Sequence, residues 1–264
     1  MNVSYFPGCT LKTKAKELDL YARKSAEALG ITLEELPEWQ CCGGVFTTAS
    51  DEIATKLSSV RALAAAGKKG QPLVSVCTAC HNVLKQTNDA MQHDKTFAAR
   101  VNAYLPPEER YDGSTQVLHY LELLRDVVGF DAIREKVVNP LNGKKIGAYY
   151  GCLLLRPSKI MQTDDPENPR LLEEFISAIG GTPVVYPYRN ECCGGYTVLE
   201  DADSATEKSK KILHSAASTG AELLVTACPL CRYNLEKSSS ELPVLYFTEL
   251  LAEALGVKPE SERE

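Results

Sequence analysis

The sequence predicts an α/β protein of two similar, pseudo-symmetric domains, each a mostly parallel sheet flanked by helices. Three observations predict this fold class. Five cysteines in the first half of the 264 residues are answered by five in the second, a 34-residue interval between cysteines recurs in both halves, and short apolar runs alternate with helical periodicity. Alternation of strands and helices along a chain is typical of parallel sheets covered by helices.

The duplication is carried by the cysteines, which form a first and a second cysteine set. These are Cys9, Cys41, Cys42, Cys77 and Cys80, then Cys152, Cys192, Cys193, Cys228 and Cys231. Residues 117–124 and 244–251 also resemble each other. A long period that occurs twice predicts two domains, because a solenoid needs short repeats and about three of them. We place the domains at residues 1–140 and 141–264, with a helical insertion at about 88–114 in the first.

In the first half, the apolar run Val3–Phe6 predicts a strand. Apolar residues at helical spacing over 18–29 predict a helix that ends at Gly30. A helix is expected near Ser50–Ala66 and a buried strand at Pro72–Val76. The insertion has a further apolar stripe, which fits a helix that covers its own domain or one that docks a partner; its residues are Phe97, Val101, Tyr104 and Leu105.

The second half repeats this order. It is expected to contain a strand at Ile146–Tyr150, a helix at 172–179 ended by Gly180-Gly181, strands at Pro183–Tyr186, Leu223–Thr226 and Val244–Tyr246, and a helix near Ala202–Ala217. Four cysteines, Cys9, Cys77, Cys152 and Cys228, come just after predicted strands. Ligand sites of open α/β sheets gather at the carboxyl ends of strands, so we expect each cysteine set to converge there.

Composition narrows the class of protein. With 44% hydrophobic and 24% charged residues the chain is an ordinary globular one, and its formal charge of −6 provides no basic field for nucleic acid. It has no run of about 18 apolar residues, so no membrane span is expected. The N-terminal residues lack the pattern of a secretory signal. We therefore expect a cytoplasmic protein.

The cysteines themselves allow four interpretations. Disulfides fit least, since adjacent residues such as Cys41-Cys42 and Cys192-Cys193 could bond to each other only with strain. The Cys-x-x-Cys pairs at 77–80 and 228–231 have spacing that suits zinc, but zinc takes four ligands and each half offers five thiols. A redox dithiol would leave three thiols per half unexplained. An extended polynuclear iron–sulfur cluster uses all five.

The motifs add a resemblance to a known family. The opening Ser4-Tyr5-Phe6-Pro7-Gly8-Cys9 and the segments Cys41-Cys42-Gly43-Gly44 and Cys192-Cys193-Gly194-Gly195, each followed by Cys-x-x-Cys, resemble the duplicated CCG-domain family to which the B subunit of heterodisulfide reductase belongs. The resemblance covers residues 1–255. It implies that all ten cysteines are ligands, with five holding a non-cubane 4Fe-4S cluster in each domain.

The resemblance also implies a function. Two clusters would face each other across the domain interface and deliver one electron to each sulfur of a small-molecule disulfide, or oxidise thiols in reverse. The partners it implies are the ferredoxin-like C subunit and the flavin-containing A subunit of a heterodisulfide reductase-type complex. The chain has no Gly-x-Gly-x-x-Gly fingerprint, so we expect no flavin or nicotinamide on it.

Two other functions stay open at this point. The chain could be an electron-wiring iron–sulfur subunit without disulfide chemistry, or a zinc-stabilised interaction protein. Beyond the cysteines the sequence offers two weak catalytic candidates, His81 after Cys80 and Arg232 after Cys231. His81 could donate to a cluster sulfur or shuttle protons to a product thiolate, or be an ordinary surface or capping residue. Either His81 or Arg232 could bind an anionic group of the substrate.

Overall fold

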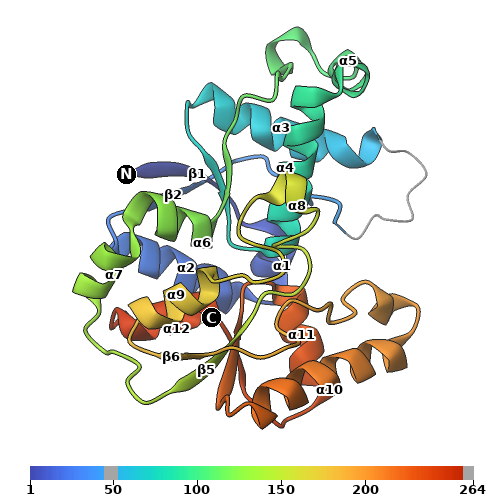
Figure 1. Cartoon of the computed structure of the whole chain (residues 1–264). Coiled ribbons are helices and arrows are strands. Elements are labelled where there is room, and N and C mark those ends of the chain that lie inside the picture. The colour runs from blue at the N-terminus through green and yellow to red at the C-terminus, as the bar shows by residue number, and fades with distance from the viewer. Residues whose placement is uncertain (45–52, 258–264) are drawn as a thin grey trace.

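The computed structural model describes residues 1–44 and 53–257, and its core consists of two four-stranded sheets (Figure 1). The strand order is β2-β1-β3-β4 in the first sheet and β6-β5-β7-β8 in the second. All neighbouring strands are parallel. The two sheets therefore have one topology, which confirms the predicted fold class. The proposed boundary at 140/141 falls between the sheets and stays a prediction.

The elements of the first half follow one another in a β-α order. They are β1 (Asn2–Phe6), α1 (Gly8–Thr13), α2 (Lys16–Ala28), β2 (Thr32–Glu35), α3 (Ala54–Lys68), β3 (Leu73–Ser75), α4 (Thr78–His93), α5 (Lys95–Ala103), the 3-10 turn η1 (Pro107–Glu109), β4 (Val117–His119), α6 (Tyr120–Leu123), the π-helical turn η2 (Leu124–Val128) and α7 (Phe130–Lys136).

The second half repeats the order without the insertion. Its elements are β5 (Lys145–Tyr149), α8 (Ser158–Met161), α9 (Leu171–Ala178), β6 (Thr182–Val184), the 3-10 turn η3 (Thr197–Leu199), α10 (Ala202–Ser218), β7 (Leu223–Thr226), α11 (Pro229–Ser238), β8 (Val244–Tyr246) and α12 (Phe247–Ala254).

Most predicted elements are present within a few residues of their expected bounds. The helix expected near Ser50–Ala66 is α3, whose described part begins at Ala54, and the first predicted residues lie outside the described ones. Two strands were missed. β2 is an edge strand that ends in two glutamates, and in β4 only two apolar residues precede His119, so neither shows the apolar run that marks a buried strand.

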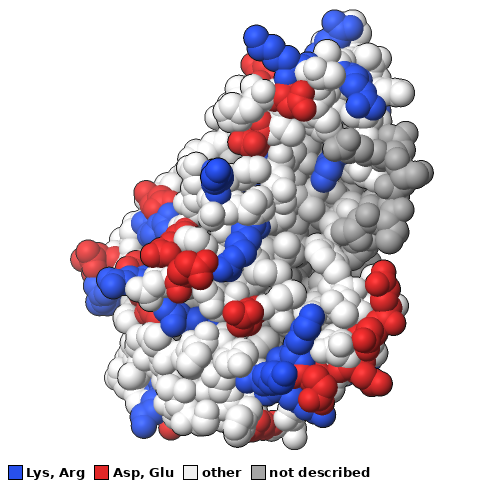
Figure 2. All heavy atoms as spheres, turned by 45° about the vertical axis from the view of Figure 1, so that its right-hand side comes forward, with Lys and Arg blue, Asp and Glu red and all other residues white. Residues whose placement is uncertain are grey.

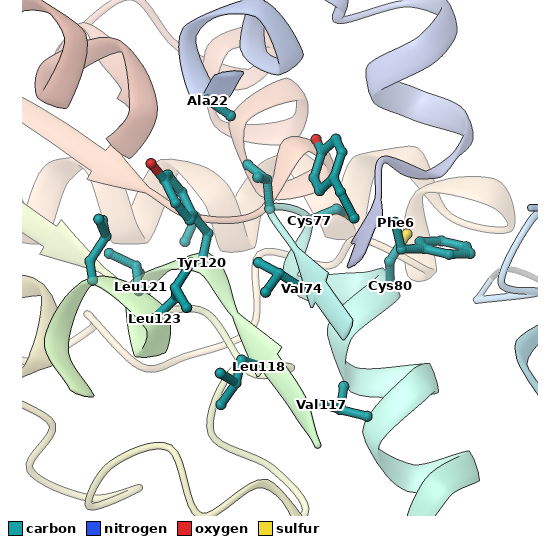
Figure 3. Close-up of a cluster of buried hydrophobic side chains, with 14 of the residues drawn as sticks. Phe6, Ala22, Val74, Cys77, Cys80, Val117, Leu118, Tyr120, Leu121 and Leu123 are labelled. Atoms are coloured by element: carbon teal, nitrogen blue, oxygen red, sulfur yellow. The ribbon is translucent and has the colours of Figure 1, made fainter. Parts of the chain in front are cut away.

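The two halves share a core. Helix α12 of the second half packs on α2 of the first, where the Thr248 hydroxyl donates a hydrogen bond to the Leu18 carbonyl oxygen at 3.3 Å. One apolar cluster includes strand residues of both sheets. Figure 3 shows the first-half part of it, in which Cys77 and Cys80 lie among apolar side chains such as Val74. Three thiols of the first set, Cys42, Cys77 and Cys80, thus belong to a folded interior.

The insertion covers its own domain. The side chains of Phe97, Val101 and Leu105 are buried in the shared core, and α5 packs on α4. Tyr104, the remaining residue of the stripe, is exposed. The apolar stripe is therefore used inside the chain, which favours the covering interpretation over the docking one.

The surface carries charges of both signs. Figure 2 shows basic and acidic side chains interspersed on the face that it presents. Among the helices of residues 1–44 and 53–257, none is long and apolar enough to cross a lipid bilayer.

Candidate functional site

Each cysteine set collects at the carboxyl ends of two neighbouring strands, as predicted. Cys9 lies in α1 directly after β1, and Cys152 lies in the turn after β5. Cys77 and Cys228 are the N-cap residues of α4 and α11, so the following turn brings Cys80 or Cys231 beside them. All ten cysteines are free thiols.

In the first set the sulfurs lie in contact pairs. Sγ of Cys42 is 3.5 Å from Sγ of Cys80, and Sγ of Cys41 is 3.8 Å from Sγ of Cys9. Cys42, Cys77 and Cys80 are buried, whereas Cys9 is exposed. Hydrogen bonds from the Cys41 and Cys80 thiols lower the pKa of Cys42 to about 3. One member of this set is thus held as a thiolate, the form that binds metal ions.

The second set repeats this arrangement. Sγ of Cys193 is 3.5 Å from Sγ of Cys231, and a hydrogen bond from Cys152 lowers the pKa of Cys192 to about 5. The pKa of Cys228 is also lowered, first by the Cys231 thiol and then by backbone N–H groups, among which is that of Ala79 in the first half. A residue of the first half therefore contributes to the second set.

The two cysteine sets lie close to each other because the residues that follow strands β3 and β7 share hydrogen-bond partners. The hydroxyl of Tyr246 contacts the carbonyl oxygens of Val76 and Ala227, at 2.7 and 2.8 Å. The Thr78 hydroxyl donates to the same Ala227 oxygen at 2.6 Å. These carbonyls directly precede Cys77 and Cys228. The two Cys-x-x-Cys helices therefore begin side by side across the interface between the halves.

Glycines make room for the sulfurs. A Cβ on Gly8 would stand 2.6 Å from Sγ of Cys80, and one on Gly151 would stand 3.2 Å from Sγ of Cys231. Both glycines have positive φ angles, of 78° and 64°. Only glycine combines this backbone conformation with such close approach of a thiol.

Gly8→Ala is expected to empty the first set of metal and leave the second loaded, because the added methyl group collides with the Cys80 sulfur. Metal content per purified chain measures this. Gly30→Ala is the matched control, since Gly30 has φ of 79° but no atom within 4 Å of its Cβ position. It adds only backbone strain of about 1–2 kcal/mol. Equal metal loss in both variants would refute the role of the close contact.

The donor set fits a polynuclear centre better than a single ion. Within the described residues, which include all ten cysteines, no three His, Cys, Asp or Glu side chains are placed to hold one metal ion. The sulfurs of a set contact one another in a chain, since Cys42 is partnered by both Cys41 and Cys80, and five such donors exceed the four that a single ion takes. A structural zinc site takes four ligands and would leave one thiol of each set unused.

A small cavity lies against the second set. It has a volume of about 20 Å³, and its walls include thiols of the second set and also Thr78 of the first half. Tyr196, which follows the second Cys-Cys-Gly-Gly segment, lines it as well. Tyr196 was not among the residues predicted from the sequence, and the difference that marks it is Val45 at the matching position of the repeat.

The sequence pattern of the cysteine-rich CCG domain matches this chain twice, at residues 3–85 and 146–236. The chain belongs to the CCG cysteine-rich domain family. Both matches contain the full five-cysteine motif. The duplicated CCG domain agrees with the resemblance stated from the cysteine motifs, and the role of each cysteine as a ligand stays a prediction.

Curated relatives are subunits of redox complexes. The CCG chain is 31% identical to the 8-methylmenaquinol:fumarate reductase membrane anchor subunit of Wolinella succinogenes, over 96% of this chain and 92% of the relative. It is 26% identical to the B subunit of the ferredoxin/F420H2-dependent CoB-CoM heterodisulfide reductase of Methanosarcina acetivorans, over 98% and 90%. Together with the CCG domain, these relatives support the general class of an iron–sulfur redox subunit for this protein.

A solved structure shares the fold. The crystal structure of a hypothetical protein from Helicobacter pylori aligns with a TM-score of 0.74 at 14% identity, over 97% of this chain. The CCG chain spans about half the length of that protein, 49%.

The two weak catalytic candidates of the CCG chain have structural partners. His81 is fully buried, and its Nε2 lies 3.0 Å from Oε2 of Glu122. Arg232 occupies the matching place in the second half, where its Nη1 lies 3.1 Å from Oε2 of Glu249. Each glutamate also accepts a hydrogen bond from the backbone N–H at the start of its own helix, α6 or α12. Both residues thus lie against the glutamates that cap α6 and α12, and the full burial of His81 excludes the surface interpretation of that residue.

Burial keeps two histidines of this region neutral, and we expect acid to destabilise the protein for that reason. Burial lowers the pKa of His119 to about 3, and it lowers that of His81 despite the nearby Glu122 carboxylate. A lowered histidine pKa stabilises the folded state above the unfolded pKa of about 6.5 and loses this effect as pH falls. By pH 5 the loss from His119 alone is about 2 kcal/mol.

The unfolding temperature at pH 7 and pH 5 measures this loss. His119→Asn keeps an acceptor at the N-cap of α6 and removes the titrating ring, so its unfolding temperature should change less between the two pH values. His214→Gln, which replaces an exposed histidine, is the control and should follow the wild type. The prediction is contradicted if the unfolding temperature of His119→Asn falls as much between pH 7 and pH 5 as that of the wild type.

Proposed function

We propose that the protein is the disulfide-reducing iron–sulfur subunit of a larger redox complex. The first cysteine set would hold one non-cubane 4Fe-4S cluster and the second set another, through the ten thiols named from the sequence. Such clusters supply electrons one at a time, and two of them suit a disulfide because its reduction takes two electrons. The protein then contributes the placement of both centres on either side of one sulfur–sulfur bond.

The observation that carries this proposal is that the two Cys-x-x-Cys helices, α4 and α11, begin side by side at the interface between the halves. Thr78 of the first half lines the cavity of the second set, and its hydroxyl is bonded to the carbonyl that precedes Cys228. A small molecule held at this interface would contact residues of both halves at once. A pair of centres at one interface is the arrangement that splitting a two-sulfur bond requires.

The proposed reaction is balanced as R–S–S–R′ plus two electrons and two protons giving R–SH and R′–SH, or its reverse. The sulfur–sulfur bond breaks, both sulfurs are reduced, and the protons come from solvent. Electrons have to arrive from another protein. We propose a ferredoxin-like C subunit as the immediate donor and a flavin-containing A subunit behind it, in line with the heterodisulfide reductase subunits among the relatives.

A second function is favoured by the fumarate reductase relative. That protein is 31% identical over nearly the whole chain, and its name describes a quinol:fumarate reductase and no disulfide. The CCG chain would then pass electrons between partners, with the two cysteine sets acting as relay centres.

One experiment separates these two functions. The anaerobically purified protein is mixed with reduced methyl viologen and a panel of small disulfides, and the released thiols are counted. The disulfide-reducing function predicts two thiols released for every two viologens oxidised. A relay protein would release no thiol with any disulfide, and its electron paramagnetic resonance spectrum would not change on addition of thiols.

A further inference from the structure

Tyr196 is placed where the two cysteine sets come closest. It follows Cys193-Gly194-Gly195 and is the N-cap residue of the 3-10 turn η3 of the second half. Its hydroxyl nevertheless lies 3.7 Å from the position that a Cβ would take on Gly44, in the first half. Sγ of Cys42 lies 3.5 Å from that same position. The phenol therefore extends from one half of the chain to the cysteine set of the other.

The same side chain lines the cavity of the second set. Its neighbours there include Cys152 and Cys228. A phenol is protonated near neutral pH, so the Tyr196 hydroxyl is a hydrogen-bond donor beside these sulfur atoms.

The hydroxyl of Tyr196 has no hydrogen-bond partner among residues 1–44 and 53–257, whereas the hydroxyls of Tyr246 and Tyr149 do. That of Tyr246 contacts two backbone carbonyls, and that of Tyr149 donates to the Glu191 carbonyl at 2.8 Å. Those two hydroxyls serve the fold. An unused donor at the edge of this cavity, whose volume of about 20 Å³ suits one water-sized group, is instead available to a single atom of a bound molecule.

The repeat supplies this phenol once. At the position that matches Tyr196, after Cys41-Cys42-Gly43-Gly44, the first half has Val45, which lies outside the described residues. Each set has five cysteines, but only the second is followed by a tyrosine at this position. A hydroxyl used once between two similar centres suits a ligand that lies between them.

We propose that the Tyr196 hydroxyl donates a hydrogen bond to a sulfur atom of the disulfide, or of the product thiolate, bound between the two cysteine sets. This inference rests on the disulfide-reducing function proposed above and adds a catalytic residue to it. Negative charge develops on sulfur as the sulfur–sulfur bond breaks, and a fixed donor stabilises that charge. The phenol gives a hydrogen bond and not a proton, so the two protons of the reaction still come from solvent.

Tyr196→Phe tests the proposal. The variant is purified anaerobically, and its iron and acid-labile sulfide are expected to match the wild type, because Tyr196 is not a ligand and has no hydroxyl contact within the described fold. Turnover with 2-hydroxyethyl disulfide and reduced methyl viologen is expected to fall about tenfold, the effect of one hydrogen bond to a charged group. The dissociation constant of 2-mercaptoethanol, read from visible absorption, should rise by a similar factor.

Two variants serve as references. Tyr188→Phe, at a half-exposed tyrosine close to the same cysteine pair but not lining the cavity, should leave turnover and thiol binding unchanged. Tyr196→His keeps a donor at the position and should recover part of the turnover lost in Tyr196→Phe. Recovery would separate the lost hydrogen bond from a general loss of packing.

The outcomes distinguish two failures. Wild-type turnover and thiol binding in Tyr196→Phe, in a protein that reduces the disulfide, would overturn the role of Tyr196 and leave the proposed function intact. A wild-type protein with full iron content that neither reduces disulfides nor responds to thiols would overturn the proposed function, and the hydrogen bond to substrate with it.

Discussion

Cys41→Ser is expected to remove one half of the bound iron and leave the other half in place. Cys41 is a predicted ligand of the first set, with its sulfur 3.8 Å from that of Cys9, and it is only partly buried. Serine is a poor ligand for iron and causes little strain at such a site. The iron content should therefore fall from about eight to about four per chain, with four sulfides lost as well.

The second half offers the mirror experiment. Cys192→Ser should remove the other four irons, because Cys192 is exposed and belongs to the second set. The double variant should hold none. Ser58→Ala is a matched control, since the Ser58 hydroxyl donates to the Cys41 carbonyl oxygen at 2.8 Å but is not a predicted ligand. Loss of all iron from either single cysteine variant would show that the two sets are not independent.

Glu122→Ala is expected to lower the stability of the fold more than any surface change. The buried carboxylate of Glu122 lies 3.0 Å from Nε2 of His81, accepts a hydrogen bond from Lys85 at 3.1 Å and accepts another from the His119 backbone N–H at 2.7 Å. Burial acts to raise the pKa of Glu122. The contacts with His81 and Lys85 outweigh burial and hold this pKa well below its usual range. Removing the carboxylate leaves these groups without their partner.

The expected loss is about 3 kcal/mol, the order found when one partner of a buried pair is removed. The unfolding temperature should fall by about 8 °C. Glu253→Ala removes an exposed ion pair with Lys144 and should change the unfolding temperature by less than about 2 °C. Equal effects of the two substitutions would contradict the structural role assigned to Glu122.

A comparison within the repeat sharpens this prediction. Glu249 takes the place of Glu122 in the second half, but burial raises its pKa, so its charge is less well compensated. Glu249→Ala should therefore cost less stability than Glu122→Ala. The difference between the two measures how far the His81 and Lys85 contacts stabilise the first half.

Sequence patterns predicted two strands of the first sheet, the four strands of the second and the convergence of the cysteines. The reason is physical: Cys9, Cys77, Cys152 and Cys228 follow strands directly, and parallel strands place their carboxyl ends together. What the sequence could not predict depends on contacts between distant segments. The hydrogen bond between the Tyr246 hydroxyl and the Val76 carbonyl oxygen, for example, connects residues 170 positions apart.

The candidate side chains show the same limit. His81 is adjacent to a cysteine and was an open candidate, but its role depends on Glu122, which is 41 residues away in the chain. Tyr196 drew no attention because its neighbour across the interface, Gly44, belongs to the other half. The difference between Tyr196 and Val45 at matching positions of the repeat was the available signal.

The central claim is that each cysteine set holds an iron–sulfur cluster, and the most direct test is the metal and sulfide content of the anaerobically purified chain. Iron, acid-labile sulfide and zinc are measured on one sample. The claim predicts roughly eight irons, eight sulfides and no stoichiometric zinc per chain. About one or two zinc ions with no sulfide would contradict it and would make the cysteine sets structural.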